Sequence, residues 1–496
     1  MELVDYSLID RSDVAEDVPN AAPDPAVLCE VPLAPLADDG LSELVPAPAL
    51  PPHAARRMAY LNVQTKFVLA LLIAAAWTGL SIWASQQWLE ELAAVTHWVF
   101  ALIAIGFIAY VPGFMNAFLI STLLLDRKPP LRPVTRYPGV TVLVAAYNEA
   151  GAIEDTLSSL ARQDYAGDYE VLILNDGSTD DTVAVVRQAL ARLDPRTNAS
   201  FRIHDFAVNR GKAAALNDGL HAAAHELIVT VDGDCWLRSD ALTQIVQRLL
   251  SDPEDTQAIA GAVMVRNSRS NLLTRAQEWD YFHGIAAVKR MQAMYHGTLV
   301  AQGAFSLYRR KALLEVGGWP ECVGEDIVVS WALLARGHRI GYAASALAFT
   351  NVPERLRQFA LQRKRWSRGL MEAFKLHWPL LFKRRLATLF IWWNICFLPL
   401  DLVYSFVFIP GLVLACFGIY YIAGPLTLAV LPLAVLWNSV IFRIQRNMFR
   451  LEGLEVRRNR GGFLFYTLAY SLLMQPVCVW GYLVEFLGMK KKWDTK

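Results

Sequence analysis

The stretch LIVTVDGD, residues 227–234, decides the fold class of this chain. Its first five residues are apolar or β-branched and have the length of a buried strand, which ends directly at Asp232-Gly233-Asp234. An apolar run of this kind is typical of a parallel strand that is covered on both faces. We therefore expect an α/β domain in which carboxylates follow a central strand.

Three similar strands precede this one, and polar residues follow each of them. The four strands are expected at residues 140–146, 170–174, 201–206 and 227–231. Helical stretches lie between them, so the pattern predicts a mostly parallel sheet, whose ligands bind beyond the carboxyl ends of its strands. Glu149, Asp176 and Asp232 follow three of these ends, so we expect them to lie at one edge of the sheet.

Long apolar segments flank this region. Hydrophobic residues make up 54% of the 496 residues, which indicates an integral membrane protein with an inserted domain. A helix needs roughly 20 residues to cross a bilayer. Spans are expected near residues 67–83, 97–125, 398–422, 426–444 and 463–487. The stretch 386–398 either lies in the interface or begins another crossing.

Basic residues set the expected orientation. Lysine and arginine flank both outer ends of the first hairpin, at positions 56, 57, 66, 127, 128, 132 and 136. The positive-inside rule then places the N-terminal tail and everything after residue 125 in the cytoplasm. Five spans would leave the lysines at 490–492 outside, against the same rule.

The chain divides into five parts. Residues 1–58 are acidic and rich in proline and are expected to be a disordered cytoplasmic tail. Residues 59–126 hold two transmembrane helices, 127–377 the soluble domain with interfacial helices, 378–489 an interfacial helix and about three further spans, and 490–496 a short basic tail.

Charge and cysteine content exclude several classes of protein. The formal net charge is +1, which gives no global field for nucleic acid or an acidic substrate. Six cysteines occur without a Cys-x-x-Cys pair, so neither a zinc site nor a disulfide framework is indicated. Cys235, beside Asp234, is expected to be a packed thiol.

Asp232 and Asp234 are the candidate metal ligands. Two carboxylates separated by glycine can offer oxygens to Mg²⁺ or Mn²⁺ and leave room for phosphates. An Asp-Gly pair is also common in a solvated turn. The position after a strand, with Asp176 at a matching strand end, favours the metal site.

Asp176 and Lys212 each have two interpretations. Asp176 either hydrogen-bonds a nucleotide or caps the helix that follows it. Lys212 follows Gly211 at a helix start, where it either meets a phosphate or is an exposed lysine of the first turn.

Two further groups lie near the end of the domain. Glu325-Asp326 opens a helix, where a carboxylate is stabilised by the helix dipole, and one carboxylate in reach of a hydroxyl can act as a general base. Gln362, Arg365 and Trp366 share one helical face, and they suit either a diphosphate and a sugar ring or a basic helix on the membrane surface.

The order and setting of these motifs resemble the membrane-embedded family-2 glycosyltransferases, the synthases of cellulose, chitin, hyaluronan and poly-N-acetylglucosamine. The resemblance covers roughly residues 60–490 and is strongest to the branch that makes poly-β-1,6-N-acetylglucosamine. The stretches that carry it are residues 277–281, 307–313, 315–319 and 325–331. Gly324 stands where this branch usually has threonine, Gln302-Gly303-Ala304 replaces its usual acceptor-loop residues, and Arg368 departs from its usual run after the tryptophan.

The resemblance implies a Rossmann-like nucleotide-diphospho-sugar transferase domain of the GT-A type, between about two transmembrane helices before it and three after it. It implies an inverting transfer of sugar, N-acetylglucosamine above all, from a UDP-sugar to a growing extracellular polysaccharide that is moved across the bacterial inner membrane. The implied roles are uridine binding by Tyr147, Glu149 and Asp176, diphosphate and metal binding by Asp232 and Asp234, general base catalysis by Asp326 with support from Glu325, and acceptor or diphosphate binding by Gln362, Arg365 and Trp366.

The implied partners are the UDP-sugar, the glycan acceptor, membrane lipid, a small membrane accessory subunit and a periplasmic export partner, without nucleic acid. Three alternatives stay open at this point. They are a synthase of another polymer, a non-processive transferase that adds one sugar to a lipid, and a non-catalytic transporter or scaffold.

Overall fold

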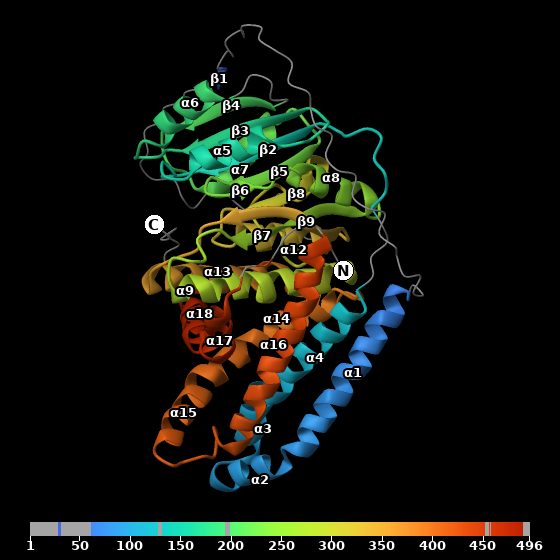
Figure 1. The fold of residues 1–496 in the computed structure, drawn as a ribbon, viewed down its shortest axis with the longest axis vertical. Helices are drawn as coiled ribbons and strands as arrows, with labels where there is room; N and C mark the ends of the chain where they lie inside the picture. Colours follow the sequence, from blue (N-terminus) through green and yellow to red (C-terminus); the bar gives the residue numbers. More distant parts are fainter. Residues whose placement is uncertain are drawn as a thin grey trace, which may run out of the picture.

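The computed structural model describes residues 28–30, 61–126, 131–193, 199–451, 456 and 458–489. An α/β domain lies above a bundle of long helices, and a layer of helices separates the two (Figure 1). Most of the expected tail at 1–58 and all of the basic tail at 490–496 lie outside the described residues.

Within the described residues, nine strands form one sheet in the order β1-β4-β3-β2-β5-β8-β7-β9-β6. The strands are β1 (Leu28–Glu30), β2 (Val140–Ala146), β3 (Tyr169–Asp176), β4 (Ala199–Phe206), β5 (Leu227–Asp232), β6 (Trp236–Leu237), β7 (Thr256–Val265), β8 (Phe305–Arg309) and β9 (Arg339–Thr350).

The sheet is mixed, and its first half matches the expectation from the sequence. Strands β4, β3, β2 and β5 are parallel neighbours, and Val140 is level with both Tyr169 and Leu227. Their carboxyl ends are therefore level as well. Strand β8 then lies antiparallel between β5 and β7, and although β7 and β9 are again parallel, β1 and β6 are antiparallel edge strands, so the sheet is mixed rather than mostly parallel.

Helices cover both faces of the sheet, as its apolar strands predict. They are α5 (Ile153–Ala161), α6 (Thr182–Arg192), α7 (Lys212–Ala222), α8 (Ala241–Ser251), α11 (Arg310–Glu315) and α12 (Glu325–Ala335). Successive residues of β2 point to opposite faces. Val142 belongs to one core, with α5 and α8, and Leu143 belongs to the other, which continues to Phe118 and Phe390 in the membrane helices. The core that contains Leu143 thus continues from the α/β domain into the bundle.

Helical segments, among them α9 (Leu272–Trp279) and α13 (Leu356–His377), form the layer between the sheet and the bundle (Figure 1). The π-helix η3 (Asp280–Ala287) and then α10 (Val288–Met294) follow α9 directly, and the short 3₁₀ helix η4 (Trp378–Phe382) follows α13.

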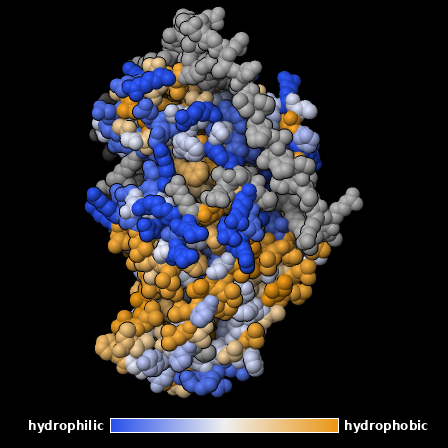
Figure 2. Space-filling view, viewed as in Figure 1, coloured by the Kyte–Doolittle hydropathy of each residue, from blue (hydrophilic) through white to orange (hydrophobic). Residues whose placement is uncertain are grey.

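Four helical stretches in the described residues are long and apolar enough to cross a membrane: 63–84, 98–124, 388–416 and 427–450. They consist of α1 (Val63–Ala84), then α3 (Trp98–Ile105), η2 (Gly106–Tyr110) and α4 (Val111–Leu124), then α14 (Thr388–Val403), η5 (Tyr404–Phe408) and α15 (Ile409–Cys416), and finally most of α16 (Pro425–Leu451), with α2 (Gln86–Val95) between α1 and α3. The stretch 386–398, left open by the sequence, lies mostly in the third of these. Figure 2 shows the belt of hydrophobic residues that these helices form, with hydrophilic residues above and below it.

The last expected span is a bent pair of helices, α17 (Arg460–Leu468) and α18 (Tyr470–Phe486), which meet at 52°. Both ends of the pair contact the interfacial layer. Asn459, before α17, donates to the carbonyl of Arg275 in α9 at 2.9 Å. Glu485, near the end of α18, accepts from Arg368 and Lys375 of α13, each at 2.7 Å. The pair therefore lies along the layer. Its two helices together make a fifth membrane span only if they also cross the bilayer.

Candidate active site

The loops after β2, β3 and β5 are bonded to one another at the carboxyl edge of the sheet. The N–H of Asn148 donates to Ser178 Oγ at 2.9 Å, and the N–H of Thr179 donates to Asn148 Oδ1 at 2.8 Å. The N–H of Gly233 donates to the carbonyl of Ala145 at 3.0 Å. These bonds hold the residues that follow each strand in one place, which is the edge where the sequence predicts a ligand.

Asp176 is 4% exposed, and its carboxylate holds a neighbouring loop. It accepts the backbone N–H groups of Arg210 and Gly211, both at 2.8 Å. Neither bond belongs to α6, the helix that follows Asp176, so in this structure the carboxylate orders the loop that begins α7. That loop carries Lys212 to the same edge.

Gly233 allows the Asp-Gly-Asp turn to lie against the β2 loop. A Cβ on Gly233 would be 3.0 Å from Glu149 Cγ and 3.1 Å from the Ala145 carbonyl oxygen, so a side chain would displace Glu149. Thr156 Oγ1 donates to the carbonyl of Gly233 at 2.9 Å. The turn is thus fixed from two sides, with Asp232 and Asp234 both partly exposed.

The donor groups at this turn suit a hard divalent cation. Asp232 pairs with Lys212, and Asp234 Oδ2 accepts from Thr350 at 3.4 Å. No group of three or more His, Cys, Asp or Glu side chains that could hold a metal occurs among the described residues. Two carboxylates with oxygens from substrate phosphates are nevertheless a common Mg²⁺ set, so the residues present fit such an ion.

Lys212 connects this turn to Glu325. Its Nζ contacts Asp232 and lies 3.7 Å from Glu325 Oε1. Burial alone would lower the pKa of Lys212, but Asp232 and Glu325 outweigh it, and the pKa is raised. Burial also raises the pKa of Glu325, and Lys212 opposes that rise. Gly303 lies against both groups, since a Cβ there would be 2.6 Å from Lys212 Nζ.

Asp326 lies beside Glu325 in the first turn of α12. Its Oδ1 accepts from the N–H of Ile327 at 2.8 Å and its Oδ2 from the N–H of Gly303 at 3.4 Å. The loop containing Gly303, which the sequence marked as unusual, therefore contacts the candidate base directly.

Gln362, Arg365 and Trp366 lie in α13, as the sequence predicts. Arg365 acts electrostatically on Glu325, so this helix faces the carboxylates of α12. Gln362 Oε1 is enclosed and has no hydrogen-bond partner among the described residues, so it can accept one from a ligand. Trp366 is 38% exposed, and its ring centroid lies 6.3 Å from that of Tyr281. Tyr147, 41% exposed, follows β2 and also lies at the carboxyl edge.

Two features of the site were missed from the sequence. The first is Arg363, which is buried, pairs with Asp280 at 2.8 Å and lies 4.0 Å from the centre of the Trp366 ring. It therefore fixes the tryptophan against η3. The only sequence signal was the spacing of three residues between Arg363 and Trp366.

The second missed feature is a contact between two glycines. A Cβ on Gly324 would lie 2.5 Å from the Cα of Gly369, and a Cβ on Gly369 would lie 2.7 Å from the Cα of Gly324. The N–H of Gly324 also donates to Glu372 of α13 at 2.9 Å. The start of α12 and the middle of α13 thus touch backbone to backbone. The unusual glycine at 324 has a packing reason in this structure.

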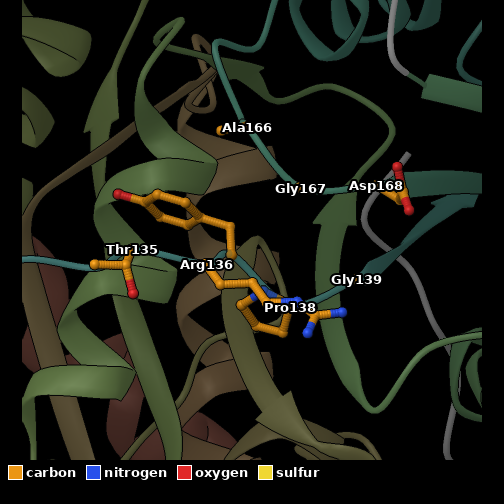
Figure 3. A pocket seen from close by; sticks show the side chains of 8 residues that line it. Thr135, Arg136, Pro138, Gly139, Ala166, Gly167 and Asp168 are labelled. Atoms are coloured by element: carbon orange, nitrogen blue, oxygen red, sulfur yellow. The ribbon is translucent and has the colours of Figure 1, made fainter.

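A separate cavity of about 400 Å³ lies at the opposite edge of the sheet, before β2 and β3. Thr135 to Gly139 and Ala166 to Asp168 line it (Figure 3). It contains none of the sequence-predicted site residues, so the candidate active site is the carboxyl edge together with α12 and α13.

The α/β domain is similar to domains of known proteins. Residues 138–369 match the family described as "Glycosyltransferase like family 2". Poly-beta-1,6-N-acetyl-D-glucosamine synthase of Staphylococcus aureus is 33% identical over 276 residues, which are 53% of this chain and 65% of that protein, just under two thirds of its length. The synthase of the same name from Staphylococcus epidermidis is 31% identical over 294 residues, 57% of this chain and 69% of that protein.

A solved structure shares the fold. A mannosyltransferase from Pyrobaculum calidifontis, in complex with GDP-Man and Mn²⁺, is 20% identical, has a TM-score of 0.51 and covers 78% of this chain and 99% of its own. The alignment with the synthases and the α/β domain between membrane helices lead to one conclusion: this chain is a member of glycosyltransferase family 2.

Proposed function

We propose that the protein transfers N-acetylglucosamine from UDP-N-acetylglucosamine to a growing polysaccharide, with inversion at the anomeric carbon, and passes the chain across the inner membrane. The observation that carries the proposal is the position of Lys212, which bridges Asp232 of the donor edge and Glu325 beside the candidate base. The similarity to two staphylococcal synthases supports the donor and the polymer.

In the proposed donor site, Tyr147, Glu149 and Asp176 lie where the uridine part would bind. Asp176 acts there in part through the loop that it orders, because both of its oxygens accept backbone N–H groups. Lys212 would move from Asp232 to the diphosphate when the donor enters. Asp232 and Asp234 would hold Mg²⁺ or Mn²⁺, whose charge offsets that of the leaving diphosphate.

In the proposed reaction, Asp326 takes the proton of the acceptor hydroxyl. The oxygen then forms a bond with the anomeric carbon, and the bond to the diphosphate breaks on the opposite face. Arg365 stabilises the charge that develops on UDP, and such preorganised groups contribute much of an enzyme's rate. Glu325 holds Lys212 in place, and Trp366 stacks on the acceptor sugar.

The proposed setting is a bacterial inner membrane with the catalytic domain in the cytoplasm. Basic residues beside the first hairpin support this orientation. The belt of hydrophobic residues supports contact with lipid. A small accessory subunit and a periplasmic export partner belong to the same proposal.

A panel of UDP-sugars with the purified full-length protein tests the proposal. We expect UDP release and a high-molecular-weight product with UDP-N-acetylglucosamine, and linkage analysis of the product should identify the bond. Asp326→Asn should abolish transfer and retain UDP binding, because the amide keeps the shape but cannot take the proton. A product of one lipid-linked sugar would contradict the polymer, and wild-type turnover by Asp326→Asn would contradict the assignment of the base.

A further inference from the structure

A buried lysine outside the predicted site lies within electrostatic reach of the candidate base. Lys289 lies in α10 and is 8% exposed. Within the described part of the chain its side chain makes no hydrogen bond or ion pair, and Asp326 is the charged group that acts on it. Burial lowers the pKa of Lys289 to about 7, and Asp326 opposes this shift. A buried ammonium without a contacting partner is costly, so a ligand that pairs with it would be stabilising.

The surroundings of Lys289 lead to the acceptor side of the site. Gln292 lies three residues later, on the same side of α10, and its Oε1 accepts from the N–H of Leu299 at 3.2 Å. The segment that begins at Leu299 continues to Gly303, whose N–H donates to Asp326. Lys289 keeps 8% of its surface exposed, so its side chain is not completely enclosed.

The helix that contains Lys289 begins as η3, and η3 contacts α13, the helix that we propose binds the acceptor. In η3, Asp280 pairs with Arg363 and Tyr281 lies against Trp366. η3 continues directly into α10. The continuous helix η3–α10 therefore runs from Trp366 of α13 to Lys289, the lysine on which Asp326 acts electrostatically. A sugar chain that stacks on Trp366 and presents its end to Asp326 would lie along this element.

We propose that Lys289 binds the acceptor: its ammonium donates a hydrogen bond to an oxygen of the terminal sugar whose hydroxyl Asp326 deprotonates. The inference rests on the proposed function and adds a determinant of acceptor choice. A terminal sugar with a free amine is positively charged and meets a like charge at Lys289, which disfavours it. An N-acetylated end is neutral and offers an amide oxygen as a further acceptor.

The test uses Lys289→Met in the purified full-length protein, because methionine keeps the length of the side chain and removes the charge. Lys311→Met is the matched control, since Lys311 is exposed in α11, away from the site. The acceptors are short β-1,6-linked N-acetylglucosamine oligomers and their fully deacetylated counterparts, with UDP-N-acetylglucosamine as donor.

For Lys289→Met we expect kcat/KM for the acetylated acceptor to fall about ten- to a hundredfold, the range for a lost hydrogen bond to a charged group. UDP affinity should stay at the wild-type value. The preference for acetylated over deacetylated acceptors should shrink, and Lys289→Arg should restore part of it. A merely structural lysine would not change this preference. Thermal stability should not fall, since the substitution removes a buried charge.

Wild-type kinetics and acceptor preference in Lys289→Met would overturn the assignment. A loss of UDP affinity in parallel with the loss of transfer would also overturn it, because the lysine would then serve the donor or the fold. If the wild-type protein itself transfers to neither acceptor, the proposed function fails, and the role of Lys289 fails with it.

Discussion

Replacing Gly324 by alanine should slow sugar transfer by separating the two helices of the acceptor site. The new Cβ would lie 2.5 Å from the Cα of Gly369 and 3.0 Å from its carbonyl carbon. Carbon atoms pack at about 3.5–4.0 Å, so the start of α12 must move from α13 by about 1 Å. The first turn of α12 carries Asp326, and a misplacement of about 1 Å can cost about a hundredfold in rate.

The assay is the rate of UDP release with saturating donor, together with UDP affinity measured separately. We expect kcat to fall about a hundredfold in Gly324→Ala and UDP affinity to fall much less, because the shifted turn reaches the donor edge only through the 3.7 Å contact between Glu325 and Lys212. Gly369→Ala should behave alike, since its Cβ would lie 2.7 Å from Gly324. Gly461→Ala is the control, because nothing lies within 4 Å of its added Cβ. Wild-type kcat in Gly324→Ala would refute the reasoning.

Three further predictions concern the metal, pH and topology. Asp234→Ala should remove the dependence of UDP binding and turnover on Mg²⁺ or Mn²⁺. The assay measures UDP binding and turnover of the variant and of the wild type as the metal concentration is raised. A wild-type metal response in the variant would exclude Asp234 as a ligand. Burial raises the pKa of the Glu325 carboxyl from 4.5 to about 7, so the folded state binds this proton more tightly than the unfolded state does. Proton binding therefore stabilises the folded state fully below about pH 4.5, and this contribution to the free energy of unfolding is lost as the pH rises through about 7. Glu325→Gln should therefore raise Tm relative to wild type at about pH 8 more than at about pH 5, and an equal difference at both would contradict the buried carboxyl. In a cysteine-free background on intact cells, a membrane-impermeant thiol reagent should label Phe417→Cys, in the loop after α15, but label Met489→Cys only after permeabilisation; labelling of both from outside would mean that α17 and α18 cross.

The parallel half of the sheet could be predicted because its signals are local. The apolar run 140–146 matches β2 to the residue, and the run 227–231 matches β5 but for Asp232. Both are short and end at polar residues. Strands β7 and β9 were not predicted, because they are rich in alanine and glycine and lack alternation. Their pairing also shifts register between Gly261 and Ala262, which no local pattern indicates.

The candidate site divides in the same way. The carboxylates could be predicted because each lies at a strand end or a helix start, and the Gln-Arg-Trp face because the spacing of its residues puts them on one side of a helix. The Gly324–Gly369 contact and the Arg363–Asp280 pair join segments that meet only in the folded chain. A buried ion pair and a backbone contact have no sequence pattern of their own, so only the structure could show them.

The helix pair α17–α18 has a consequence for dissecting the protein. Arg368 and Glu485 are both almost fully buried, and Arg368 also donates to the carbonyl of Met489. Removing one partner of such a pair costs about 3–5 kcal/mol. A catalytic fragment cut after α13 would leave Arg368 without its counter-ion and would also lose the Tyr470 hydroxyl that accepts from Arg363. We therefore expect a fragment cut after α13 to unfold at a lower temperature than the full-length protein, and a purification tag belongs beyond Met489.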